Sequence, residues 1–351
     1  MRMHTFDEVM TALATRAARL RMHDECFQPA SLQLEAPAPG APWTVHPPSG
    51  PPLLLEEHAR SQLWRLLDLQ PATMRRLDPS LALEGTRRAL PAYLRRLRLR
   101  IANEERVRAV LPLEEHRIED SALLRLLNPV FLRHEGHILR FEVDDAFFAL
   151  RVDFPDSTEE LRVGDVVRRG VELRNSEIGT EPTRLADVVC RIICSNLSEQ
   201  DYMQWRHPSS LAAVSDRMGE IDQRVAQFKK DAGLGGLQRA FEVMRQSRLL
   251  DRARAVKAFA SLTHLGALRE PVERRFLSAK QSLVSGELEL LEPSAMGLWN
   301  ATTSVAREIP APPGDAQMRG VPKRKLSQAA GRLLDTAFLR ELMAEYASSE
   351  K

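Results

Sequence analysis

Between residues 137 and 194, four successive segments alternate apolar and polar residues, and this pattern limits the fold more than any other feature of the chain. The segments read HILRFEV, FFALRVDF, VVRRGVELR and TRLADVVCRIICS, and short polar breaks separate them. A period of two residues predicts β-strands with one buried face, and short polar breaks predict hairpin connections. We therefore expect an antiparallel sheet here.

The buried face of that sheet follows from the alternation. In the first two strands it would hold Leu139, Phe141, Val143, Phe148, Leu150, Val152 and Phe154. In the fourth strand the apolar stripe is Ala186, Val188 and Cys190, opposite Asp187 and Arg191. The remaining charges, among them Glu142, Asp153 and Glu172, would lie on the solvent side, where opposite charges pair across strands.

The connection between the third and fourth strands contains Asn175, Ser176, Glu177 and Gly179. Asn and Gly tolerate positive φ, and Asn and Ser side chains bond the amides of their own turn. The turn has two interpretations: it contacts DNA or a neighbouring subunit, or it satisfies buried backbone amides where the strands converge.

Helical patterning flanks the sheet. A helix is expected around residues 7–21, and further helices over 53–99, with one strand at RVRAVL and a helix that Asn128-Pro129 ends. The proline-dense residues 36–52 predict an exposed loop, and after Ser198 we expect only helices, including one segment over roughly 237–265. The fold class is α+β: a helical N-terminal region, a central antiparallel sheet of four or five strands, and a helical C-terminal half packed on it.

Five regions follow from these patterns. They are residues 1–52 (helix and proline-rich loop), 53–128 (helices with one strand), 129–197 (sheet), 198–306 (helices) and 307–351 (proline-rich basic linker and last helix).

Composition leaves several classes of partner open. The formal net charge of +2 is nearly balanced and excludes no class of partner. The three cysteines lack the spacing of a zinc site, so we expect a reduced, cytoplasmic protein without metal or cofactor. No apolar run is long enough to cross a bilayer, so no membrane association is expected. His134 and His137 lack the i, i+4 spacing and the third ligand of a metal site.

Three blocks carry a family resemblance: RVRAVLPLEEHRIEDSALLRLL, the segment GDVVRRGVELRNSEIGTEPTRLADVVCRIICSN, and LWNATTSVAR. In this order they resemble a phage/plasmid-like protein family that is catalogued only as a domain of unknown function. The hairpins followed by a helix are also similar, more distantly, to single-strand annealing proteins of the recombination-mediator type. These resemblances imply a mobile-element setting and a role in DNA recombination.

Basic residues supply the candidate nucleic-acid interface. The solvent side of the sheet would present Arg140, Arg151, Arg168, Arg174 and Arg191, and later helices carry Lys229, Lys230, Arg239, Arg245, Arg248, Arg252 and Lys257. The spacing of Arg245, Arg248 and Arg252 predicts one helix face that follows a phosphate backbone, with Tyr202 and Trp205 available to stack bases. The alternative is that the sheet arginines only pair with neighbouring carboxylates.

The sequence thus predicts a non-enzymatic single-stranded DNA-binding and strand-annealing protein that acts as a homo-oligomer, with a replication or recombination protein as a further partner. An accessory protein-interaction factor of a mobile element, such as a defence inhibitor or a replication partner, is the alternative.

Overall fold

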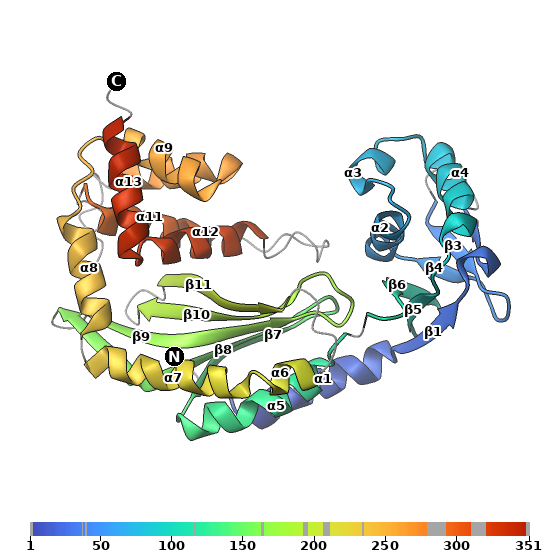
Figure 1. Ribbon diagram of the computed structural model, residues 1–351, viewed down its shortest axis with the longest axis horizontal. Coiled ribbons are helices and arrows are strands. Elements are labelled where there is room, and N and C mark those ends of the chain that lie inside the picture. Colours follow the sequence, from blue (N-terminus) through green and yellow to red (C-terminus); the bar gives the residue numbers. More distant parts are fainter. Residues whose placement is uncertain are drawn as a thin grey trace.

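The chain forms two β-sheets and their covering helices in a computed structural model (Figure 1). The described residues are 3–36, 38, 41–115, 117–162, 165–191, 196–205, 211–233, 235–278, 293–309 and 321–348. One sheet has six strands and the other has five. The prediction of a single sheet of four or five strands is therefore wrong, although the mixture of helices and strands is as expected.

The six-stranded sheet lies where helices, a proline-rich loop and one strand at RVRAVL were expected; that strand is confirmed, and the other five were not predicted. Its strands are β1 (His23–Phe27), β2 (Gln33–Glu35), β3 (Trp43–His46), β4 (Leu53–Leu55), β5 (Leu97–Ala102) and β6 (Arg106–Pro112), in the order β1-β5-β6-β4-β3-β2. β4 and β6 run parallel and the other pairs are antiparallel. With α2 (Glu57–Leu66), α3 (Pro71–Met74) and α4 (Pro79–Ala89), this sheet forms the N-terminal lobe, residues 21–113.

Part of the proline-dense segment belongs to the core of this lobe. Trp43 and Val45 of β3 are each 2% exposed, and the Trp43 ring packs edge to face on Trp64 of α2. The prediction of an exposed loop over residues 36–52 is wrong at β3, because four residues give too short an alternation to be seen beside so many prolines.

The five-stranded sheet is an antiparallel meander of β7 (His137–Val143), β8 (Phe148–Arg162), β9 (Asp165–Asn175), β10 (Thr183–Arg191) and β11 (Asn196–Trp205). The first four coincide with the alternating segments of the sequence. β11 was not expected, since the strands were predicted to stop at Ser198. A register shift between Ile138 and Arg140 moves Leu139 out of the predicted stripe, and Ile138 enters the core instead.

Three helices cover one face of this sheet: α1 (Phe6–Leu20), α5 (Asp120–Arg133) and α7 (Met218–Gly233) (Figure 1). A capping box of Thr5 and Glu8 begins α1. α5 continues past Pro129, contrary to the predicted stop, because Val130 and Phe131 beyond the proline are buried in the shared core. Pro129 itself is exposed.

The short α6 (Leu211–Ser215) adds Val214 to the core shared by α1, α5 and α7. The other helices form a second core at the end of the chain; they are α8 (Gly236–Gln246), α9 (Arg252–Thr263), α10 (Arg269–Ser278), α11 (Ala295–Glu308), α12 (Val321–Arg332) and α13 (Thr336–Ser348). α11 and α12 lie against β11, on the opposite side of the sheet from α7 (Figure 1). Within the described ranges, no helix combines the length and the apolar composition that crossing a membrane requires.

Gly170 of β9 is where the sheet tolerates no side chain. A Cβ atom at this position would lie 2.3 Å from the carbonyl oxygen of Val152 on β8. We expect Gly170→Ala to lower the free energy of unfolding by about 1–3 kcal/mol, because the strands must separate to admit the methyl group. Urea denaturation measures the change.

Gly219→Ala is the matched control, since no described atom lies within 4 Å of the place that a Cβ atom would take on this residue of α7. It should leave stability unchanged or raise it by up to about 1 kcal/mol, because alanine favours the helix. Equal effects of the two substitutions would contradict the close approach of β8 and β9.

Candidate nucleic-acid interface

The sheet face turned away from α1, α5 and α7 carries charged residues. Cross-strand register sets Arg151 opposite Glu172, and Arg174 opposite Arg184. Directly paired residues point to the same side of a sheet, so these four side chains share one face. We call this side the arginine face; it comprises Arg140, Glu142, Arg151, Asp153, Arg168, Glu172, Arg174 and Arg184.

Glu172 lies at the centre of the arginine face, with its side chain 4% exposed. Its carboxylate oxygens lie 2.5 Å from Arg151, 2.5 Å from Arg174 and 3.9 Å from Arg184. The positive charges of Arg174 and Arg151 hold the pKa of the Glu172 carboxyl far below its usual range, against the opposing effect of burial. Glu172 is therefore an anion that three guanidinium groups share.

Further ion pairs extend the arginine face outwards. Arg174 also lies 3.6 Å from Glu181, and its guanidinium stacks over the Phe147 ring. Arg168 bonds Asp153 at 3.1 Å. Arg140 is 58% exposed and lies 3.8 Å from Glu142. The four predicted sheet arginines that are described therefore all have carboxylate neighbours, as the alternative interpretation predicted.

β10 departs from the predicted orientation. Ala186 pairs with Glu172, so the stripe of Ala186 and Val188 lies on the arginine face. Asp187 lies on the other face and accepts a hydrogen bond of 2.8 Å from Nε of Arg224 on α7, while burial raises the pKa of its carboxyl. Arg184 was missed for the same reason: the apolar stripe two residues after it suggested the opposite side.

The predicted arginine stripe on one helix is wrong. Arg245 lies in α8, Arg248 in the loop that follows, and Arg252 at the first position of α9. Arg252 is buried and donates to the carbonyl oxygen of Phe276 at 2.9 Å. Arg245, Arg248 and Arg252 are three and four residues apart, but they do not share one helix and so have no common face.

The other predicted contacts are dispersed or lie outside the described side chains. Lys229 pairs with Asp156, and exposed basic side chains occur on three different helices: Lys230 on α7, Arg239 on α8 and Lys257 on α9. Arg191 has Val167 as its register partner, and its side chain lies outside the described residues. The same holds for the side chains of Tyr202 and Trp205 on β11.

The Asn175–Gly179 turn follows β9 directly and is buried. Asn175 donates through Nδ2 to the Ile118 carbonyl oxygen at 2.8 Å and to Oδ1 of Asp120 at 2.6 Å, and its own Oδ1 accepts from Thr183. Ser176 donates to the Ala146 carbonyl oxygen at 2.6 Å. These contacts support the structural interpretation of the turn, in which its side chains satisfy buried polar groups.

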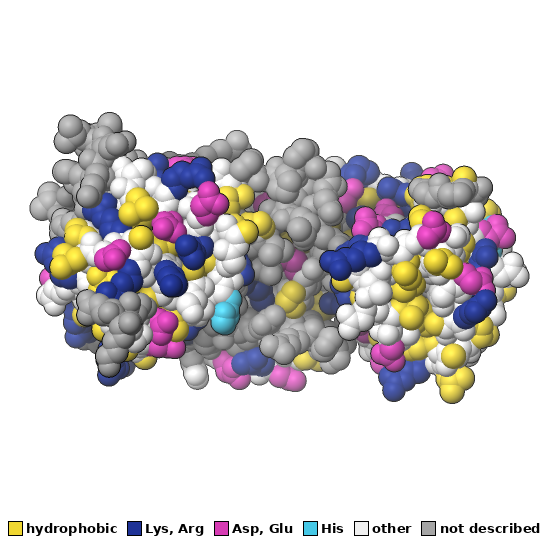
Figure 2. Space-filling model, turned by 90° about the horizontal axis from the view of Figure 1, so that it is seen from above, with side chains coloured by type: hydrophobic (Ala, Val, Ile, Leu, Met, Phe, Trp, Pro, Cys, Tyr) yellow, Lys and Arg dark blue, Asp and Glu magenta, His cyan; other side chains and the backbone are white. Residues whose placement is uncertain are grey.

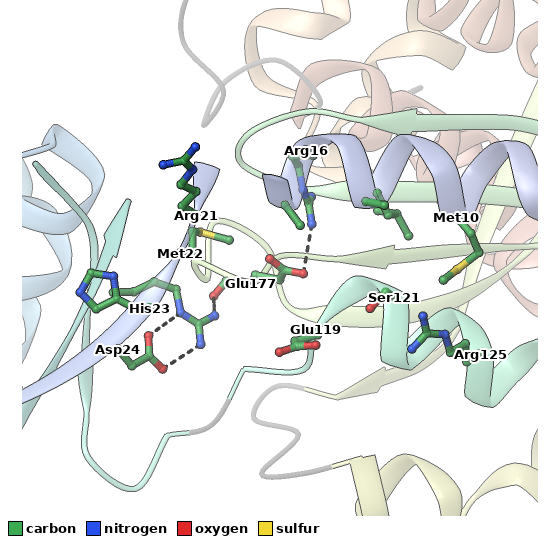
Figure 3. Close-up of a pocket in the computed structure, with 14 residues that line it drawn as sticks. Met10, Arg16, Arg21, Met22, His23, Asp24, Glu119, Ser121, Arg125 and Glu177 are labelled. Carbon is green, nitrogen blue, oxygen red and sulfur yellow. Dashed lines mark hydrogen bonds and ion pairs between the residues drawn. The ribbon is translucent and has the colours of Figure 1, made fainter. Parts of the chain in front are cut away.

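Glu177 connects the turn to α1, α5 and β5 (Figure 3). Its Oε1 accepts from the backbone N–H of Asp120 at 2.8 Å and lies 3.0 Å from the Arg16 guanidinium, which also bonds Asp120 at 2.5 Å. The Glu177 carbonyl oxygen accepts from Arg100 at 2.5 Å. Burial, then the charge of Glu177, raises the pKa of Asp120 to about 7, although Arg16 acts in the opposite direction.

Ile178, the next residue, attaches the turn to α2. The Ile178 carbonyl oxygen accepts from Nε2 of His58 and from Nε2 of Gln62, each at 2.9 Å. Burial lowers the pKa of His58 to about 4. Gly179 adopts φ +77°, and a Cβ there would lie 2.6 Å from the Arg117 guanidinium, so this position favours glycine.

In the described parts of the chain, no three His, Cys, Asp or Glu side chains are grouped so that they could hold a metal ion. His134 bonds Asp222 at 3.0 Å.

No family model matches the chain, and neither a curated protein nor a solved structure is detectably similar to it. The resemblance to the phage/plasmid-like family stays a prediction.

The turn should make stability depend on pH through two groups of opposite sign. The folded pKa of Asp120 lies above its unfolded value near 3.9, so its contribution falls as pH rises from about 4 to 7, by about 1.4 kcal/mol per unit. The folded pKa of His58 lies below its unfolded value near 6.5, so its contribution falls as pH drops from about 6.5 to 4.

Paired variants separate the two groups. Between pH 5.5 and 7.5, Asp120→Asn should make the free energy of unfolding rise more steeply with pH than in the parent protein. His58→Gln, which keeps an N–H donor for Ile178, should make it fall more steeply. Urea denaturation across this range gives both slopes, and unchanged slopes would contradict the perturbed titrations.

Removing the central carboxylate of the arginine face tests its electrostatic role. Glu172→Gln should lower the free energy of unfolding by about 3 kcal/mol, because it leaves Arg151, Arg174 and Arg184 together without their shared anion. Glu142→Gln removes an exposed partner of the same face and should change it by less than about 0.5 kcal/mol. Similar losses in both variants would count against the shared pairing.

Proposed function

We propose that this protein binds single-stranded DNA along the arginine face and anneals complementary strands without nucleotide hydrolysis. The observation that carries the proposal is that the strand register places five described arginines on one face of four adjacent strands: Arg140, Arg151, Arg168, Arg174 and Arg184. Guanidinium groups gathered on one face attract anions, and a guanidinium group can donate two parallel hydrogen bonds to a phosphate.

The shape of the molecule is compatible with an extended ligand. Seen from the side of α11 and α12, Lys or Arg side chains lie on the edge of the N-terminal lobe that faces the C-terminal helices (Figure 2). In Figure 1 the five-stranded sheet spans the distance between the two parts. A strand lying across the sheet would pass from Arg168 on β9 towards Arg140 on β7.

The proposed binding relies on charge. Phosphates would compete with Asp153 and Glu142 for the two more exposed guanidinium groups, those of Arg168 and Arg140. Such contacts to the backbone do not depend on base sequence. Annealing then requires that two coated strands meet, which an oligomer would promote; the resemblance to annealing proteins points the same way.

A protein partner is the alternative, and exposed leucines on the N-terminal lobe favour it. Leu81 of α4 is 61% exposed, and Leu77 just before that helix is 40% exposed. Apolar contacts of this kind would persist at high salt. Contacts to phosphates release counterions from the DNA, so their affinity falls steeply as the salt concentration rises. Salt dependence therefore separates the two functions.

The direct test is fluorescence anisotropy of a labelled single-stranded oligonucleotide at about 50 and about 200 mM salt. The double variant Arg140→Gln/Arg168→Gln should bind at least about tenfold more weakly, and the slope of log affinity against log salt should fall by about 1–2. Both residues lie on the proposed path and are more exposed than the other described arginines of that face.

Arg217→Gln is a control that removes one charge from the other side of the sheet. This arginine is 40% exposed, pairs with Glu220 and precedes α7, which covers the opposite face of the sheet. Its affinity should stay within about twofold of the parent value. Absence of binding by the parent protein at low salt would refute the proposal, and equal losses in the control would show that the binding is not located on the arginine face.

A further inference from the structure

A cavity of about 480 Å³ lies between α1, α5, β1, β5 and the Asn175–Gly179 turn (Figure 3). Its position between α1 and α5 places it on the helix-covered side of the five-stranded sheet, away from the arginine face. Its volume falls in the range of small-molecule sites, which is about 300–1,000 Å³. Neither DNA binding on the arginine face nor a protein partner on the N-terminal lobe requires it.

One wall of the cavity is apolar. Met10, Leu13, Ala14 and Ala17 of α1 recur at helical spacing along it, and Met22 continues this wall just after the helix. Methionine side chains adapt to ligands of varied shape, and two of them border this cavity. The wall is suited to the flat or flexible apolar body of an organic molecule.

Charged side chains from α1, α5, β1 and β5 also line the cavity, and they differ in how they are paired. Arg16 forms ion pairs with Asp120 and Glu177. The Nε atom of Arg100 lies 2.8 Å from Oδ1 of Asp24, and the same guanidinium donates to the Glu177 carbonyl oxygen. These contacts occupy the carboxylates of Asp24 and Glu177 within the protein.

One lining arginine differs from these. Arg125 is exposed and forms no ion pair with any residue that the structure describes, whereas Arg21 turns away from the cavity at its other end (Figure 3). Arg125 projects from the same helix as Ser121, one turn further along, and Ser121 also lines the cavity. The Glu119 carboxylate lines the cavity too, and its negative charge acts on the Arg100 guanidinium.

We propose that this cavity binds a small organic anion that has an apolar body and a single sulfonate, carboxylate or phosphate group. The anionic group would lie beside Arg125 and Ser121, and the apolar body would contact Met10 and Leu13 at the same end of the cavity (Figure 3). Arg16 and Arg100 border the same space and also hold Glu177, so the bound anion would rest against the contacts that join the N-terminal lobe to the sheet.

The probe is 8-anilino-1-naphthalenesulfonate, an aromatic sulfonate that fluoresces when its rings leave water. Titration into the full-length folded protein should give a saturable signal at one site per chain. Ala14→Trp, which fills the cavity from α1, should weaken binding at least about tenfold. Arg125→Gln, which removes an exposed charge without a described ion pair, should weaken it about three- to tenfold.

Two controls match these variants. Ala18→Trp places the same indole on an exposed position of α1 outside the cavity, and Arg76→Gln removes an exposed arginine of the N-terminal lobe. Both should leave the affinity within about twofold. Far-ultraviolet circular dichroism and the unfolding midpoint would show that each variant is folded, since partly unfolded chains also bind this dye.

Three outcomes would overturn the inference. A signal that does not saturate, or an affinity that Ala14→Trp leaves unchanged, would show that the cavity holds no ligand of this size. Binding that Ala14→Trp abolishes and Arg125→Gln leaves intact would show an apolar site without preference for anions. DNA binding by Ala14→Trp should equal that of the parent protein, so failure of this inference is distinguishable from failure of the proposed function.

Discussion

The contacts of Glu177 hold together parts of the chain that are distant in sequence. Its carboxylate accepts from the first N–H of α5 and from Arg16 of α1, and its carbonyl oxygen accepts from Arg100 of β5. The next residue, Ile178, accepts from His58 and Gln62 of α2. One turn at the end of β9 thus joins the N-terminal lobe, two helices and the sheet, and it does so through directional bonds in a buried setting, where an unmade bond is costly.

Buried charge recurs at two places along β9, and each place has a different balance. At the turn, two carboxylates share Arg16, so burial leaves Asp120 with a raised pKa. At Glu172, three arginines lie around one carboxylate, and the charges of Arg174 and Arg151 keep the acid ionised. Replacing such groups by apolar ones often costs little stability, whereas removing one partner alone costs much. Their arrangement therefore fixes which strands and helices meet more than it adds to overall stability.

The sequence predicted the meander because β7 to β10 are long and alternate regularly, and it predicted the Asn175–Gly179 connection because that turn requires glycine at positive φ. It missed the N-terminal sheet because β2, β3 and β4 have three or four residues each, and because β1 pairs with β5 about 75 residues away. It misjudged the arginines after α7 because helix ends, which separate Arg245 from Arg252, carry weaker signals than helix interiors.

The arginine face and the cavity lie on opposite sides of the sheet, yet β9 links them. Arg168, Glu172 and Arg174 point to one side of this strand, and three residues after Arg174 the chain reaches Glu177, which borders the cavity. β9 pairs with both β8 and β10, and Gly170 leaves no room for a side chain against Val152, so these contacts hold the strand on both edges. A ligand that moved Glu177 would therefore act through β9 on the positions of Arg168, Glu172 and Arg174.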